Sequence, residues 1–248
     1  MDIHSVCLFL CLTILGARSR SVEPAPDVND NDSGFDWRDK GVITPVSDQG
    51  QLGDAADFVI AEGVESLLAI QTKTKAVVLS REEVGVCCDD PDTHQPKYSG
   101  FDCIKAIGGL CGQYSYKNHS GKCQSKKCTP LGKVTGTGYI SKGREDEMLK
   151  VILLTPIAAV IDASQESFQM YQNGVYSEPK CSFTQVDHPV QIVGYGTDES
   201  GQDYWIIKNS WGVSWGEQGY MRLLRGKNMC GIASFAFYPI NKSTTDQN

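Results

Sequence analysis

Cysteines have the widest chemistry in this sequence, because a thiol can form a disulfide, bind a metal or act as a nucleophile. The chain has 248 residues and ten cysteines, of which Cys7 and Cys11 lie in an apolar N-terminal stretch. An even number of remaining cysteines favours disulfides if the chain enters an oxidising compartment. The remaining cysteines are Cys87, Cys88, Cys103, Cys111, Cys123, Cys128, Cys181 and Cys230.

The first 19 residues predict a cleaved secretory signal peptide. An apolar segment runs from Val6 to Leu15, and Ala17 and Ser19 fit the small-x-small pattern before a cleavage site. A membrane anchor is the alternative, but a spanning helix needs about 20 apolar residues and this segment has about half of that. We therefore expect a secreted protein, or one of a lysosome-like secretory compartment, with no membrane partner.

Metal binding is a weaker interpretation of the cysteines than cross-linking. The cluster formed by Cys103, Cys111, Cys123 and Cys128 lacks the paired C-x-x-C spacing of a zinc site. We expect no metal and no cofactor. Three N-x-S/T sequons are compatible with glycosylation in the secretory compartment. They lie at Asn31, Asn118 and Asn241.

Composition indicates a globular protein and excludes two kinds of partner. The hydrophobic fraction is 40%, and the formal net charge is −7. Nucleic acids and anionic membranes require clustered Lys and Arg, and no run of five basic residues occurs. The polar, Pro- and Asp-rich residues 20–34 predict a flexible lead-in, residues 35–240 a folded domain, and residues 241–248 a polar tail.

Helical signals dominate the first half of the folded segment. Asp54 is a predicted N-cap for a helix that runs to about Gln71. Ser80 and Glu83 have the spacing of a capping box that opens a second helix. Residues 87–133 are cysteine-dense and are predicted to be loop-like. The predicted buried face of the first helix comprises Phe58, Val59, Val64, Leu67, Leu68 and Ile70.

The second half has the pattern of strands. A short amphipathic helix is predicted at 145–154, and apolar or β-branched runs at 156–163, 190–196, 204–211 and 220–226 are bounded by turn residues. Helices followed by strands without alternation predict an α+β fold with two halves packed together.

Long motifs in the chain identify it as similar to a known family. They read DWRDKGVITPVSDQGQ, LSREEVGVC, VDHPVQIVGYG, YWIIKNSWGVSWGEQGYMRL and NMCGIASFAFYP. From Phe35 to Pro239 the chain resembles the papain family of cysteine proteases, in particular its cathepsin L-like branch. The resemblance implies a papain-like two-lobed fold over 35–240, in which a helical first half packs against a β-barrel-like second half with the cleft between them.

The resemblance also assigns the positions of a protease active site, except one. It implies Gln49 as the oxyanion donor, His188 as the acid and base, Asn209 as the residue that orients the imidazole, and Trp211 as its aromatic shield. The histidine and asparagine of the family lie roughly 130–150 residues after the nucleophilic cysteine, and this spacing points to position 55. That position is Ala55, which has no atom that can attack a carbonyl.

The two residues after Ala55 also depart from the family pattern. Ala56 replaces a tryptophan, and Asp57 places a carboxylate where the family usually has a small apolar residue. A carboxylate here is expected to pair with His188 and raise the pKa of the imidazole, replacing the lost thiolate as counter-charge. Asp54 and Asp57 are not positioned like the lost thiol and are not expected to act as nucleophiles.

One family disulfide is missing at both ends. Leu52 stands at the position of one cysteine, and residues 96–100 (PKYSG) lack both the second cysteine and the Gly-Gly edge that resembles a rail for substrate backbone. The resemblance implies the bridges Cys87–Cys123 and Cys181–Cys230. Three pairings of the other cysteines stay open. These are Cys88, Cys103, Cys111 and Cys128.

Two further features bear on substrate binding and activation. Phe235 falls at the base of the main specificity pocket of cathepsin L-like enzymes, and is expected to fill or shorten it. Pro189 is expected to favour extended geometry at His188. About 15 residues lie between the predicted signal and the mature start, where these enzymes carry an inhibitory pro-segment of roughly a hundred, and an unarmed domain would need no such inhibitor.

The sequence therefore predicts a secreted papain-like homologue without peptidase activity. It would act as a binding or regulatory protein with a protein or peptide partner, protease inhibitors among the candidates. Two alternatives remain: an active cysteine-type endopeptidase, as the family would imply, and a structural extracellular glycoprotein.

Overall fold

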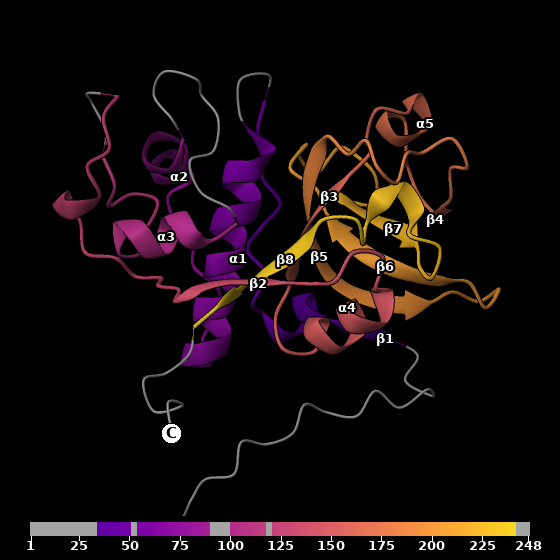
Figure 1. Cartoon of the computed structure of the whole chain (residues 1–248), viewed down its shortest axis with the longest axis horizontal. Coiled ribbons are helices and arrows are strands. Elements are labelled where there is room, and N and C mark those ends of the chain that lie inside the picture. The colour runs from indigo at the N-terminus through magenta and orange to yellow at the C-terminus, as the bar shows by residue number, and fades with distance from the viewer. Residues whose placement is uncertain (1–33, 51–53, 90–99, 118–120, 242–248) are drawn as a thin grey trace, which may run out of the picture.

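The computed structural model describes four segments of the chain, residues 34–50, 54–89, 100–117 and 121–241 (Figure 1). Several predictions lie outside the described residues. They concern the signal peptide 1–19, the lead-in up to residue 33, Leu52, the PKYS residues 96–99, the sequons at Asn31 and Asn118, and the tail beyond Asn241.

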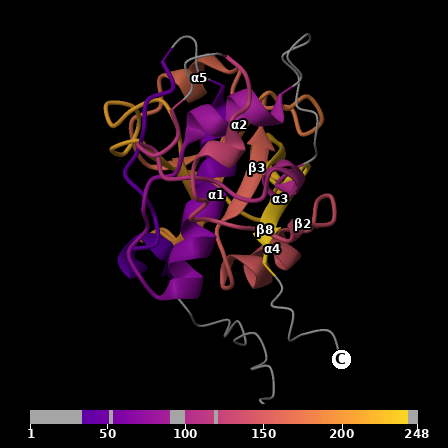
Figure 2. The same ribbon diagram turned by 90° about the vertical axis from the view of Figure 1, so that its left-hand side faces the viewer.

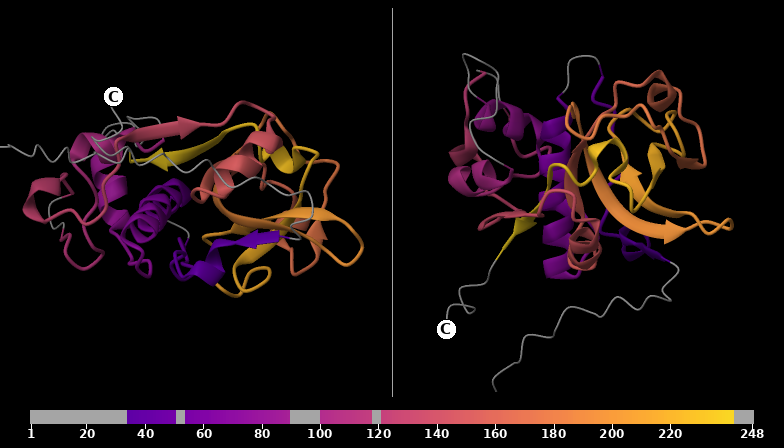
Figure 3. Two further views of the ribbon diagram at one scale, coloured as in Figure 1. Left: turned by 90° about the horizontal axis from the view of Figure 1, so that it is seen from below. Right: turned by 45° about the vertical axis from the view of Figure 1, so that its right-hand side comes forward.

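The first three helices gather at one end of the molecule, and most of a single sheet lies at the other, beside two short helices (Figures 1 and 3). The predicted first two helices are present, and the third lies in the segment predicted to be loop-like. That helix has only six residues, too few for a helical period to stand out from the sequence. The helices of this part are α1 (Ala55–Thr72), α2 (Arg81–Cys88) and α3 (Asp102–Ile107).

Helix α1 begins as the sequence predicts, because the Asp54 side chain accepts a hydrogen bond of 2.8 Å from the backbone N–H of Ala56. Its burial differs from the predicted single apolar face. Glu62, Glu65 and Ser66 are buried as well, since α1 packs against α2 on one side and against β5 on the other. Figure 2 shows α1 running the length of this face of the molecule, beside α2 and α3.

Helix α2 confirms half of the predicted capping box. The Ser80 hydroxyl accepts a hydrogen bond of 3.1 Å from the N–H of Glu83. The Glu83 carboxylate does not return to Ser80; it accepts from the N–H of Cys111 at 2.9 Å. The Ser80 N–H instead donates to the Cys111 carbonyl, so the loop at Cys111 completes the cap.

Eight strands form one sheet in the order β2-β8-β3-β5-β6-β7-β4, with β1 pairing on β5. All pairs are antiparallel except β4 with β7. The four predicted runs correspond to β3, β5, β6 and β7. Strands β1, β2, β4 and β8 were not predicted. The bounds are β1 Gly34–Asp36, β2 Gly136–Tyr139, β3 Ile157–Ile161, β4 Val175–Tyr176, β5 His188–Thr197, β6 Asp203–Lys208, β7 Tyr220–Leu224 and β8 Ala236–Ile240.

The remaining elements are short and lie mainly beside the sheet. The predicted helix at 145–154 is α4 (Glu145–Ile152), and its Glu145 carboxylate accepts from the Trp205 indole N–H at 2.8 Å. None of the helices in the described part of the chain is both long and apolar enough to cross a membrane. The other elements are η1 Trp37–Lys40, η2 Ser125–Lys127, α5 Glu166–Gln169 and η3 Met229–Gly231.

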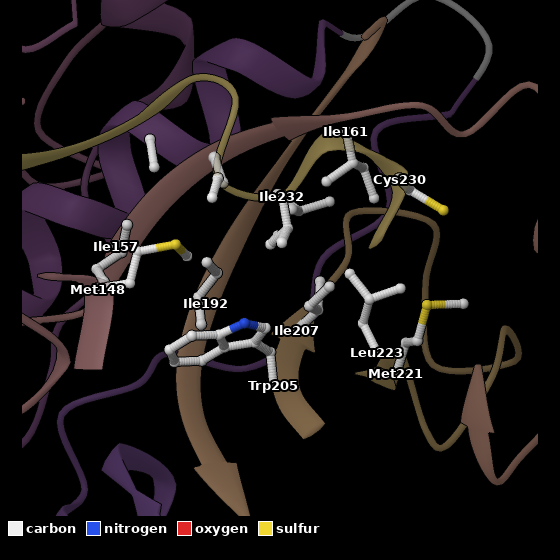
Figure 4. Close-up of a cluster of buried hydrophobic side chains, with 14 of the residues drawn as sticks. Met148, Ile157, Ile161, Ile192, Trp205, Ile207, Met221, Leu223, Cys230 and Ile232 are labelled. Atoms are coloured by element: carbon white, nitrogen blue, oxygen red, sulfur yellow. The ribbon is translucent and has the colours of Figure 1, made fainter. Parts of the chain in front are cut away.

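Two hydrophobic cores correspond to the two parts of the fold. The core of the sheet part includes Met148, Trp205 and Ile207, which point toward one another from α4 and β6 (Figure 4). The core of the helical part draws Ala158 and Phe237 from the sheet. Strands β3 and β8 therefore contribute to both cores and hold the two parts together.

Four disulfides cross-link the described residues. Cys87–Cys123 and Cys181–Cys230 confirm the two bridges implied by the family resemblance. The open pairings are settled as Cys88–Cys103 and Cys111–Cys128. Three of the four bridges lie in the helical part, whose core is the smaller of the two.

A buried ion pair also joins the two parts. Lys208 at the end of β6 is fully buried, and its ammonium lies 2.7 Å from the Glu62 carboxylate on α1. Glu65, one turn further along α1, accepts from the Leu79 N–H at 2.8 Å and from the Thr44 hydroxyl at 2.5 Å. Burial raises the pKa of Glu65, and the neighbouring Glu62 adds to the rise.

Candidate active site

Strands β5 and β6 bring His188 and Asn209 together. His188 opens β5, and Asn209 directly follows β6, which pairs with β5 in an antiparallel register. The imidazole Nε2 lies 2.8 Å from the Asn209 side-chain oxygen, and both residues are buried. The extended geometry expected of His188 before Pro189 is confirmed by its place in the strand.

An aromatic wall covers this pair. The Trp211 ring centroid lies 4.8 Å from that of His188, and Phe168 meets Trp211 edge-on at 5.5 Å. The backbone of Trp211 also forms a bridge with Asp48, which ties the wall to the loop that carries Gln49. The histidine is therefore held in a largely dry environment.

Burial lowers the pKa of His188 below its ordinary value, because an imidazolium is costly to remove from water. The hydrogen bond to Asn209 and the charges of Asp187 and Asp54 act in the opposite direction and are outweighed. The expected rise of this pKa through a carboxylate at the start of α1 is not found: Asp54 acts in that direction but is outweighed by burial, and Asp57 is not among the groups that act on His188. The pKa moves down, and the carboxylates that influence it are Asp187 and Asp54.

Gln49 is fixed by a residue that the sequence analysis missed. Its backbone N–H donates to the Ser210 carbonyl at 2.8 Å, and the Ser210 hydroxyl donates to its side-chain oxygen. The Ser210 N–H in turn donates to the Asn209 side chain at 2.8 Å. Ser210 thus links the Gln49 loop to Asn209. Its place between Asn209 and Trp211 in the NSW motif could have identified it as a site residue from the sequence.

Ala55 stands at the first position of α1, where helical N–H groups and the helix dipole favour an anion. Its methyl group is buried, with 4% of the residue exposed. The preceding residue, Asp54, is close enough to His188 to act on its pKa. Position 55 thus carries a buried methyl group at the start of α1, directly after a residue whose charge acts on His188.

A pocket of about 540 Å³ lies between α1 and α2 on one side and β3, β5 and β8 on the other. Phe235 lines this pocket; its ring centroid lies 5.5 Å from that of Phe237, and 46% of the residue stays exposed. The lining residues are Ala56, Asp57, Val59, Ile60, Val84, Cys88, Asp89, Gly100, Cys103, Val160, Pro189, Phe235 and Phe237.

A second hollow, of about 480 Å³, lies on the side of His188 that faces Trp211. It includes Asp187, Ser164 and Gln169, three polar residues that the sequence analysis did not single out. The site thus has an apolar pocket at Pro189 and a more polar hollow at His188.

Other predicted site residues lie away from this region or in other roles. The Asn241 side chain, a predicted glycosylation site, donates to the Gln71 side chain at 3.1 Å. Glu83, Cys111 and Cys128 bring three potential metal-binding atoms close together, but the two sulfurs are bonded to each other.

Comparison with known families agrees with the geometry. Residues 32–240 match the profile of the family described as "Papain family cysteine protease". This chain belongs to the papain family. Among relatives, the chain is 40% identical over 222 residues to cathepsin L of Sarcophaga peregrina, and 41% identical over 214 residues to cysteine proteinase 3 of Dictyostelium discoideum. These alignments cover 82% and 83% of this chain but only 62% and 63% of the relatives, so the chain spans less than two thirds of their length.

Solved papain-family structures share the fold. Bromelain from Ananas comosus, solved with the E64 inhibitor, superimposes with a TM-score of 0.76 at 32% identity, over 85% of this chain and all of that one. Procathepsin L2 from Tenebrio molitor gives 0.74 at 30% identity, over 86% of this chain and 69% of that one. The helical part, the sheet part and the site between them are therefore those of the papain fold.

Proposed function

We propose that this papain-family chain is a catalytically inactive homologue that uses its cleft to bind a protein or peptide. The observation that carries the proposal is Ala55 as the first residue of α1, directly after Asp54, whose charge acts on the hydrogen-bonded His188. In the family's chemistry a thiolate at this helix end attacks the peptide carbonyl. A methyl group has no lone pair with which to do so.

Among the described residues, the two carboxylates next to Ala55 in the sequence do not replace the missing sulfur. The Asp54 carboxylate caps the helix, and Asp57 lines the apolar pocket rather than the hollow at His188. Removing a nucleophile of this kind costs on the order of 10⁶ in turnover in a well-studied protease. The lowered pKa of His188 fits this state, because an imidazole without a thiolate partner has little reason to hold a proton.

Binding by the cleft is supported by what the chain keeps. The pocket is open, and the Gln49 loop is fixed through Ser210 to the sheet. A partner that recognises active papain-family enzymes, such as a protease inhibitor, would meet a familiar surface here. Four disulfides support a secretory compartment, since such bonds persist where conditions are oxidising.

A set of three proteins tests the proposal: the wild type, Ala56→Trp, and Ala55→Cys combined with Ala56→Trp. Each is purified from the secretory pathway and assayed against a broad fluorogenic peptide panel. We expect cleavage only from the protein that contains the new cysteine, with Ala56→Trp alone as the matched control for the changed pocket wall.

The active-endopeptidase alternative makes the opposite prediction. Cleavage by the wild type that disappears in His188→Ala would overturn the proposal. Absence of cleavage by both the wild type and the double variant with the new cysteine, in preparations that show cooperative unfolding, would agree with an inactive protein. It would also indicate that substrate binding is lost.

A further inference from the structure

We propose that the apolar pocket selects a positively charged side chain, an arginine or lysine of a peptide, and that the Asp57 carboxylate is the selecting group. This inference rests on the proposed function only in that the cleft is used for binding. The pocket is otherwise apolar, with Val59, Val84 and Phe235 among its walls, so a carboxylate within it decides which end group is accepted.

Asp57 is built into the pocket by the packing of two helices. Its carboxylate lies over Gly85 of α2, where a Cβ would sit 2.5 Å from Oδ2 of Asp57. The absence of a side chain at Gly85 thus leaves the space that the carboxylate occupies. Asp57 lies within the first turn of α1, where a negative charge is favourable, and its carboxylate makes no hydrogen bond or ion pair with another residue of the described segments.

The electrostatics of the pocket favour a cation. Burial, together with the charges of Asp89 and Asp54, raises the pKa of Asp57 to about 7. Asp89 also lines the pocket. A bound ammonium or guanidinium would offset the burial and repulsion that the carboxylate experiences in the free protein.

The shape and lining of the pocket suit a charge on an apolar stem. Its volume of about 540 Å³ accommodates a long side chain, and the apolar walls can cover the methylenes of lysine or arginine. Phe235 and Phe237 add two aromatic rings, which attract cations through their faces. Ala56 and Asp57, the two positions that depart from the family beside Ala55, both line this pocket.

Matched charged and neutral probes test the inference. The first pair is butylguanidinium and its neutral isostere butylurea. The second is acetyl-Ala-Arg-Ala-amide and the same peptide with citrulline. Binding to the full secreted chain is followed at pH 8 by NMR chemical shifts and calorimetry. We expect each cation to bind at least tenfold more tightly than its neutral partner, and the arginine peptide to bind more tightly than butylguanidinium.

Two variants assign the selectivity to Asp57. Asp57→Asn keeps the shape of the side chain and is expected to reduce the preference for the cation at least tenfold. Asp54→Asn is the matched control: it removes a carboxylate one turn away that does not line the pocket, and asparagine still caps the helix, so less than a threefold change is expected.

The pH dependence gives an independent readout. Because the carboxylate must be ionised to attract the cation, the affinity for the arginine peptide is expected to fall at least tenfold between pH 8 and pH 5, while the citrulline peptide changes little. Equal binding of charged and neutral probes, or an unchanged preference in Asp57→Asn, would overturn the inference. Neither result would touch the absence of peptidase activity, so the two proposals fail separately.

Discussion

The two sides of the cleft differ in what their side chains do for the fold. On the sheet side, Asn209 accepts hydrogen bonds within the site, and Trp211 packs against His188 and Phe168. These residues are part of the packing between β5, β6 and the loop of Gln49. On the helix side, Ala55 contributes only a buried methyl group at the start of α1, and alanine is a favourable helix residue.

This difference teaches that a retained active-site residue is not by itself evidence of retained catalysis. Asn209 and Trp211 have structural reasons to persist that do not depend on turnover. A nucleophile has none, because its loss leaves the N-terminus of α1 intact. Three of the departures expected from the sequence, Ala55, Ala56 and Asp57, lie together in the first turn of α1.

The largest expected change in stability comes from removing the charge of Asp57 on the helix side of the cleft. Asp57 has a folded-state pKa of about 7, above the ordinary value of 3.8, so folding disfavours its ionised form. The destabilisation of the folded protein by the ionised Asp57 is absent below about pH 4. It grows between about pH 4 and pH 7 and is complete above about pH 7. We expect Asp57→Asn to raise the free energy of unfolding at pH 8 by on the order of 2–4 kcal/mol.

Urea unfolding of wild type and Asp57→Asn at pH 4 and pH 8 measures this effect. The pH 4 comparison is the internal control, because a protonated aspartic acid and an asparagine then differ little in charge. A difference that is the same at both pH values would contradict the raised pKa and remove the electrostatic cost that distinguishes the helix side.

A smaller change in stability, this time a loss, is expected when Asn209 on the sheet side of the cleft is replaced. Asn209→Ala removes the acceptor of the Ser210 N–H and the partner of His188, and leaves both groups buried. Such unsatisfied groups cost about 1–3 kcal/mol. Thermal and urea unfolding are expected to show this loss, whereas Asn241→Ala, which removes an exposed amide contact with Gln71, changes stability little. A stable Asn209→Ala would mean that the sheet side is kept for another reason.

The extent of sequence-based prediction also differs between regions. Apolar runs flanked by turn residues located β3, β5, β6 and β7, because buried strands carry that signal locally. Strands β2 and β8 were not predicted, since each is defined by pairing with a partner about a hundred residues away, as in Tyr139 with Phe237. The register of such pairs is a property of the folded chain rather than of a short window.

Buried charged residues were the second feature that the sequence did not predict. The predicted buried face of α1 did not include Glu62 and Glu65, yet both are buried, and Lys208 and Arg81 pair with them from other elements. The same limit applied to the site. Motifs located His188 and Asn209, but only the packing of α1 on α2 shows that Asp57 belongs to a pocket rather than to the imidazole.

The smallest expected effect is a change in the pKa of His188, which tests whether position 55 on the helix side acts on the sheet side. In the wild type, burial holds this pKa below 6.5, and NMR titration of the imidazole is expected to show it there. In Ala55→Cys, a thiolate at the end of α1 would stabilise the imidazolium, so the pKa is expected to rise by about one unit or more. Ala55→Ser is the matched control, because a hydroxyl does not ionise in this range and leaves the pKa nearly unchanged. Equal values in all three proteins would show that position 55 and His188 are not electrostatically coupled.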